Sequence, residues 1–164
     1  IIIKSLGLDP LCVYRKSNNK FVELLIQNIR GKNATYAPKG DIGAKKSYLW
    51  LRKGKSLALL MDQKLNEGLS IDFLGKPANT ASFIADIAIR MNLDIVPIKF
   101  SRDINNHNII TFYKKINMPK NNLSKNKKIS FILKQVNDVM SQWIKDQPEN
   151  WLWIHRRWQK DLYV

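Results

Sequence analysis

Apolar residues recur at helical spacing in four stretches of the chain. Residues 17–31 place Phe21, Leu24, Leu25 and Ile29 on one helical face, with Ser17 or Asn18 as a possible N-cap and Gly31 just past the end. The other three stretches are residues 44–54, 81–92 and 129–147; they include an apolar group of Tyr48, Leu49 and Leu51 and a stripe of Phe83, Ile84, Ile87 and Ala88. Gly54 closes the second stretch, Thr80 can cap the third, and Pro148 ends the fourth. The pattern therefore predicts four helices.

Three further runs have the length of β-strands. The runs "SLALLMD" and "DIVPIKF" are apolar enough to be buried strands, and "NIITFYKKIN" alternates between apolar and polar positions. Pro97 lies inside the second run and removes a ladder hydrogen bond, so it belongs at a sheet edge, a bulge or a strand end. Because helices and strands alternate, we expect parallel neighbours and an α/β fold, with a central, mostly parallel sheet flanked by helices.

Composition adds a partner class and a domain count. The 164 residues suffice for one domain, spanning residues 1–164, and 45% of them are hydrophobic. The 28 Lys and Arg against 13 Asp and Glu give a net charge of +15, which favours an anionic partner: nucleic acid, phosphorylated lipid or an acidic protein. The single cysteine, Cys12, excludes an intramolecular disulfide, and no cluster of Cys and His offers a metal site. No segment reaches the roughly 20 apolar residues of a membrane span.

Several polar residues follow the apolar runs, where α/β proteins place working side chains. Arg15 comes directly after a short apolar stretch and could hold a phosphate or carboxylate, or be an ordinary surface arginine. Asp62 follows four apolar residues and, with Glu67, could bind, orient or act as a base, or form a solvated turn. The segment "IDFLGKPANT" looks like a rigid approach to a helix N-terminus, a generic anion site.

The closing segment "PENWLWIHRRWQ" concentrates aromatic and basic residues. His155 beside Arg156 and Arg157 could be a general base next to an anion clamp, but no acid lies at a helical spacing to orient it. The alternative is a packing role for Trp151, Trp153 and Trp158, with the arginines facing outward or stacking on the rings.

In their order along the chain, these motifs resemble a known family. "VYRKSNN", "MDQ" with a later glycine, "IDFLGKPANT", "IVP" followed by Arg102, and "PENWLWIHRRW" are similar to the late acyltransferases of lipid A biosynthesis. These are lauroyl and myristoyl transferases within the lysophospholipid acyltransferase superfamily. The resemblance covers almost the whole chain, and its most specific element is the C-terminal motif.

The resemblance implies a glycerolipid-acyltransferase-like fold and an enzyme at the cytoplasmic face of a bacterial inner membrane. It would move a fatty acyl group from acyl carrier protein to a hydroxyl of an anionic lipid A precursor, with no cofactor, no metal and no nucleic acid expected. Arg15, Asp62, Gln63 and Arg102 then become substrate-binding or orienting residues, while His155, Arg156 and Arg157 either contact anionic lipid or support the fold. Phe73, Gly75, Pro77, Ala78 and Thr80 match the family's loop, and Pro97 its valine-proline block.

One departure bears on mechanism. Members of this family share a histidine followed five positions later by an acid, H-x-x-x-x-D/E, in which the acid orients the catalytic base. Here Phe112 stands five positions after His107, and Lys160 five after His155, so no catalytic pair is present in the sequence. In the family the motif ends shortly before the segment that here reads "IIIKSLGLDPLCVYRK".

The simplest interpretation of this departure is a chain that starts just after the motif, as a fragment, a split reading frame or a decayed gene product. The fold would then be incomplete at its N-terminus, and an N-terminal segment or partner chain would be missing, together with a membrane anchor. Two other functions stay open on the sequence alone: a basic nucleic-acid-binding module, and a membrane-surface protein without catalytic activity.

Overall fold

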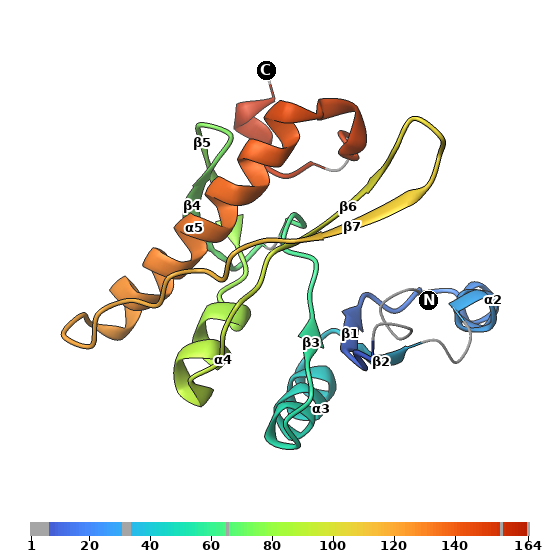
Figure 1. The fold of residues 1–164 in the computed structure, drawn as a ribbon, viewed down its shortest axis with the longest axis horizontal. Coiled ribbons are helices and arrows are strands. Elements are labelled where there is room, and N and C mark those ends of the chain that lie inside the picture. The colour runs from blue at the N-terminus through green and yellow to red at the C-terminus, as the bar shows by residue number, and fades with distance from the viewer. Residues whose placement is uncertain (1–6, 31–33, 65, 155, 164) are drawn as a thin grey trace. The chain divides into compact units, whose positions relative to one another are not determined.

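The structure is a computed structural model that describes residues 7–30, 34–64, 66–154 and 156–163. Two compact units divide the chain, unit 1 over residues 1–60 and unit 2 over residues 61–164 (Figure 1). That a single domain spans residues 1–164 stays a prediction.

Unit 1 is built on a three-stranded parallel sheet. Strand β1 (Leu11–Tyr14) lies between β2 (Thr35–Pro38) and β3 (Leu57–Ala58), and Leu11 is the partner of both Thr35 and Leu57. Helices α2 (Lys20–Arg30) and α3 (Asp41–Arg52) connect the strands. The predicted α/β class with a parallel sheet flanked by helices is confirmed, although β3 takes only two residues of the run "SLALLMD".

Helix α3 packs on the sheet through its smallest residues. A Cβ added to Gly43 would lie 1.8 Å from the carbonyl oxygen of Pro38, so only glycine allows this close approach to β2. Gly43 and Ser47 are buried, whereas Tyr48 and Leu49, two of the apolar residues from which the helix was predicted, are exposed. The helix was predicted correctly, but its inward face is set by close backbone packing rather than by its largest side chains.

Unit 2 combines two antiparallel hairpins with two helices. Strands β4 (Leu69–Phe73) and β5 (Lys76–Thr80) form the first hairpin, and β6 (Ile98–Arg102) and β7 (Asn108–Phe112) form the second. Helix α4 (Phe83–Met91) packs against the long helix α5 (Lys125–Asp146), which also contacts β4. Two short 3-10 turns follow, η2 (Pro148–Asn150) and η3 (Lys160–Leu162). Most of the core lies between α4 and α5, with Ala85, Ala88, Ile129, Ile132, Leu133 and Val136.

The second hairpin corrects the expected strand pairing. The runs "SLALLMD" and "DIVPIKF" were expected as buried parallel neighbours, but β3 pairs with β1, and β6 pairs antiparallel with β7. Phe100 in β6 is exposed, because a two-stranded ribbon cannot bury both of its faces. Pro97 lies directly before β6, a strand end as predicted, and its carbonyl accepts a hydrogen bond from the Tyr113 amide at 3.0 Å.

Candidate functional site

The segment "IDFLGKPANT" forms a tight hairpin instead of a loop leading to a helix. Leu74 and Gly75 both have positive φ, 54° and 79°, the combination that a two-residue turn between twisted strands requires. Thr80, predicted to cap a helix, is instead fully buried at the end of β5. Its hydroxyl donates to the Ala78 carbonyl at 3.0 Å, and Ser82 occupies the N-cap position of α4.

Arg157 inserts into this hairpin from the C-terminal segment. Its side chain is only 1% exposed; Nη1 donates to the Asn79 carbonyl at 2.6 Å, and Nη2 donates to Thr80 Oγ1 at 2.8 Å. The guanidinium lies 4.8 Å from the centre of the Phe73 ring. Burial lowers the pKa of Arg157, and the negative charge of Asp62 opposes that shift. Of the two roles predicted for Arg157, this environment is the structural one.

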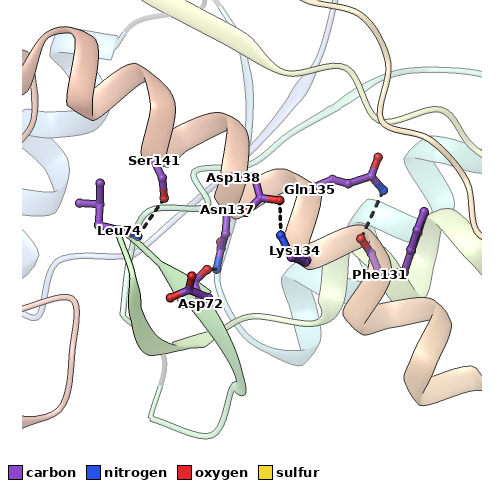
Figure 2. Close-up of polar contacts among 8 residues, drawn as sticks. All are labelled: Asp72, Leu74, Phe131, Lys134, Gln135, Asn137, Asp138 and Ser141. Carbon is purple, nitrogen blue, oxygen red and sulfur yellow. Dashed lines mark hydrogen bonds and ion pairs between the residues drawn. The ribbon is translucent and has the colours of Figure 1, made fainter.

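Helix α5 also holds this hairpin. Asn137 Nδ2 donates to the Asp72 carbonyl at 2.9 Å and to Thr80 Oγ1 at 3.1 Å, and Ser141 Oγ accepts the Leu74 amide at 3.0 Å. Figure 2 shows Asn137 and Ser141 reaching from α5 toward Asp72 and Leu74. Thr80 is therefore shared between α5 and the C-terminal segment. We call this group of Thr80, Asn137, Ser141 and Arg157 the hairpin clasp.

Two tryptophans complete the packing around Phe73. The Trp151 and Trp158 rings lie 5.7 and 5.9 Å from the Phe73 ring, and Trp158 Nε1 donates to the Phe73 carbonyl at 3.2 Å. Trp151 Nε1 donates to Asp62 Oδ2 at 3.3 Å, which ties the loop after β3 to the C-terminal segment. The packing role predicted for Trp151 and Trp158 is confirmed, whereas Trp153, predicted with them, is 53% exposed and contacts the Trp151 ring edge-on. Asp62 is half-buried, with the half-buried Gln63 next to it in the chain.

The basic loop after β1 has a different character. Arg15 and Lys16 are exposed and line an open cavity of about 410 Å³, together with Ser17, Asn18 and Asn19. The cap of α2 is Asn19, not Ser17 or Asn18, because Asn19 Oδ1 accepts the amides of Phe21 and Val22 at 2.9 and 3.3 Å. Arg15 is thus an exposed cation at the carboxyl end of a parallel strand and next to the N-terminus of α2, and its binding role stays a prediction.

Below this loop, Glu23 of α2 is buried and fully engaged. It accepts hydrogen bonds from the Tyr14 hydroxyl at 2.6 Å, the Ser17 amide at 2.8 Å and Gln27 Nε2 at 2.8 Å. The hydrogen bond from the Tyr14 hydroxyl, and after it the one from the Ser17 amide, lowers the pKa of the Glu23 carboxyl. The Tyr14–Glu23 hydrogen bond also raises the pKa of Tyr14. The network fixes the start of α2 and the shape of the loop that carries Arg15.

Other predicted site residues lie in the β6–β7 hairpin and the C-terminal segment. Arg102 is exposed at the end of β6, and its Nη1 donates to Asn106 Oδ1 at 3.2 Å. Arg156 is exposed, and His155 lies outside the described residues. In unit 2, Asp62 and Arg157 share the neighbourhood of the hairpin clasp.

A histidine and a carboxylate do meet in the turn between β6 and β7. His107 Nδ1 lies 3.0 Å from Asp103 Oδ2, but the acid precedes the histidine by four positions and therefore does not form the family motif. Asp103 Oδ1 also accepts the amides of Asn105 and His107, and these contacts lower the pKa of the Asp103 carboxyl. His107 is exposed and Asp103 is half-buried, and their contacts hold the turn between the two strands.

Three contacts of the site were missed from the sequence. Asn137 had a signal, because it is a polar residue on the apolar face of α5, four positions after Leu133. The contact between Trp151 and Asp62 joins residues 89 positions apart, and the Tyr14–Glu23 contact joins a strand to a helix; neither has a local pattern.

Over the residues that the structure describes, no three His, Cys, Asp or Glu side chains gather as a metal site would require. The same residues form no helix with the length and apolar character to cross a bilayer.

Comparison with known proteins agrees with the motifs. The family model for bacterial lipid A biosynthesis acyltransferases matches residues 3–160. No curated protein matches the chain.

Proposed function

The chain belongs to the bacterial lipid A biosynthesis acyltransferases, and from this premise we propose that it serves the transfer of a fatty acyl group from acyl carrier protein to a lipid A precursor. The acceptor is a hydroxyl of the precursor, and the reaction takes place at the cytoplasmic face of the inner membrane. The observation that carries the proposal is the family match over residues 3–160, nearly the whole chain.

Transfer from a thioester to a hydroxyl needs a base. The base removes the hydroxyl proton, the oxygen attacks the thioester carbonyl carbon, and the carbon–sulfur bond breaks to leave an ester and a thiol that takes up the proton. The sequence holds no H-x-x-x-x-D/E pair. We therefore place the base outside these 164 residues and assign substrate binding and orientation to the residues inside them.

Arg15 is the first of these binding residues. Its exposed guanidinium at the open cavity after β1 suits a phosphate or sugar acid of the precursor, which it would grip through two parallel N–H groups. Neighbouring Lys16 adds a second positive charge without a fixed geometry. Arg102, exposed on the second hairpin, is proposed as a further contact to the anionic substrates.

Asp62 and Gln63 are proposed as orienting residues. The indole of Trp151 donates a hydrogen bond to one oxygen of the Asp62 carboxylate, and the charge of Arg157 acts on the same neighbourhood. An anchored carboxylate is suited to orient a hydroxyl or an amide of a bound substrate. The net charge of +15 supports two anionic partners, acyl carrier protein, which is acidic, and the phosphorylated precursor.

Two assays test the function. The first mixes the purified 164-residue chain with acylated carrier protein and lipid A precursor, alone and together with a segment that carries H-x-x-x-x-D/E. We expect no acyl transfer by the chain alone and transfer when the segment completes it. Turnover by the chain alone would contradict the assignment of the base, and no turnover in either arm would contradict the function.

The second assay measures binding of the lipid A precursor, which does not depend on the base. Arg15→Ala should weaken binding on the order of tenfold, the loss expected for one charged hydrogen-bonding group. Arg52→Ala, an exposed arginine at the end of α3, is the matched control and should bind as the unmodified chain does. Equal losses in both variants would mean that only net charge matters. Tight, salt-sensitive binding of nucleic acid without binding of precursor would support a nucleic-acid-binding module instead.

A further inference from the structure

Helix α2 turns its polar face toward its own sheet. Glu23 is buried against Tyr14, Gln27 donates to Glu23 at 2.8 Å, and the Arg30 guanidinium lies 4.7 Å from the centre of the Tyr14 ring. A helix on the surface of a globular unit normally does the opposite and places its apolar face inward. The orientation of α2 is therefore fixed by specific hydrogen bonds and not by burial of its apolar residues.

The apolar face of α2 points away from the sheet. Phe21, Leu25 and Ile29 follow one another at four-residue spacing and are 85%, 58% and 74% exposed. Val22 and Leu24 on the same helix are exposed as well. Five large apolar side chains on three turns make a continuous patch, and patches of this kind mark interaction surfaces. We call it the α2 apolar face.

Positive charge borders this face at its N-terminal end. Residues 1–60 carry twelve Lys and Arg against three Asp and Glu, and one of those acids is the buried Glu23. Arg15, Lys16 and Lys20 are exposed at the N-terminal end of α2. An apolar helix face bordered by basic residues is the arrangement of helices that lie in the interface of anionic bilayers, where apolar burial and attraction to lipid headgroups act together.

We propose that α2 docks flat on an anionic membrane surface, with Phe21, Leu25 and Ile29 among the acyl chains and Lys16 and Lys20 at the headgroups. This deepens the proposed function and rests on its membrane location, not on the transfer reaction. A second copy of the chain fits less well, because pairing two α2 apolar faces would bring two strongly basic units together. Nucleic acid would satisfy the lysines and leave the apolar side chains in water.

The test is cosedimentation with lipid vesicles. The unmodified chain should bind vesicles that contain phosphatidylglycerol, bind vesicles of phosphatidylcholine alone much less, and lose affinity as salt rises. Leu25→Gln combined with Ile29→Gln should reduce binding to the anionic vesicles by on the order of tenfold or more, since both side chains would leave the acyl region.

The matched control replaces an exposed leucine and an exposed isoleucine elsewhere. Leu152 and Ile104 are 61% and 99% exposed and belong to unit 2, so Leu152→Gln with Ile104→Gln makes the same chemical change in the other unit. The control should bind anionic vesicles as the unmodified chain does. Both double variants should keep the melting temperature of the unmodified chain, because all four side chains are exposed.

The outcomes separate this inference from the proposed function. If the unmodified chain binds and the α2 variant binds equally well, the α2 inference is wrong and the membrane location stands. If the unmodified chain binds no anionic vesicle, the α2 inference fails, while the transfer and precursor-binding assays still decide the proposed function. A lower melting temperature of the α2 variant would mean that the face packs on protein, and a change from dimer to monomer would mean that a second copy covers it; either result overturns the inference.

Discussion

Helices α2 and α5 have the same kind of sequence pattern and opposite orientations. In α5 the apolar residues Ile132, Leu133 and Val136 are buried against α4, whereas the α2 apolar face is exposed. Periodicity states that a helix has two faces, but it does not state which face points inward. In α5 the apolar residues have a partner helix; in α2 the network of Glu23 with Tyr14 and Ser17 holds the polar face inward instead.

The largest expected change in stability that tests this contrast comes from truncating one leucine in each helix. Leu133→Ala in α5 should lower the free energy of unfolding by about 3 kcal/mol, because it removes a fully buried side chain and leaves a cavity. Leu25→Ala in α2 should change it by less than about 0.5 kcal/mol, because that side chain is already exposed. Urea unfolding followed by circular dichroism measures both. A large loss for Leu25→Ala would show that α2 packs its apolar face after all.

The next largest expected change concerns the hairpin clasp, where the buried Arg157 guanidinium holds the hairpin through hydrogen bonds. Arg157→Ala should destabilise unit 2 by about 2 kcal/mol, because the Asn79 carbonyl and Thr80 Oγ1 each lose a charged donor while the cost of burying that charge disappears. Trp151 and Trp158 pack on the same Phe73 ring as Arg157, so tryptophan fluorescence reports the unfolding. Arg156→Ala, at an exposed neighbour, is the control and should be nearly neutral. Similar losses for the two variants would contradict the structural role of Arg157.

The smallest effect is the acid sensitivity of the network that orients α2. The folded-state pKa of Glu23 is lowered from the ordinary value of 4.5, so its contribution to stability is present above pH 4.5 and is lost as the pH falls through the lowered value. Glu23→Gln should therefore lower the melting temperature at neutral pH. It should also make the further fall in melting temperature below pH 4.5 smaller than in the unmodified chain. Glu67→Gln, an exposed acid in unit 2, should keep the dependence of the unmodified chain. If Glu23→Gln keeps the acid sensitivity of the unmodified chain, titration of Glu23 does not contribute to it.

Local patterns predicted the elements better than their partners. The helices containing Phe21, Gly43 and Leu133 and the strand after Pro97 follow from spacing and from the backbone limits of proline, which act within a few residues. The tight hairpin around Gly75 was missed because the sequence shows a glycine but not the positive φ of Leu74. The pairing of β6 with β7 was missed because alternation of apolar and polar residues predicts a strand but not the strand it pairs with.

The candidate site divides in the same way. Arg15 after β1 and the packing of Trp151 and Trp158 were predicted from motifs and position, and Arg157 was left between two roles. The structure places Arg157 inside the hairpin clasp. Its hydrogen-bond partners there, Thr80 and Asn79, lie 77 and 78 positions earlier in the chain. Contacts across such a separation depend on how the whole unit folds, and no window of sequence contains them.

The hairpin clasp also has a consequence for synthesis on the ribosome. The hairpin of β4 and β5 emerges early, but its Asn79 carbonyl waits for a donor that lies 78 residues later in the chain. Asn137, which lies twenty residues before Arg157 in the chain, also donates to Thr80 Oγ1 at 3.1 Å. A product of synthesis that stops before this segment therefore lacks the Arg157 guanidinium and the Trp158 ring that pack on Phe73.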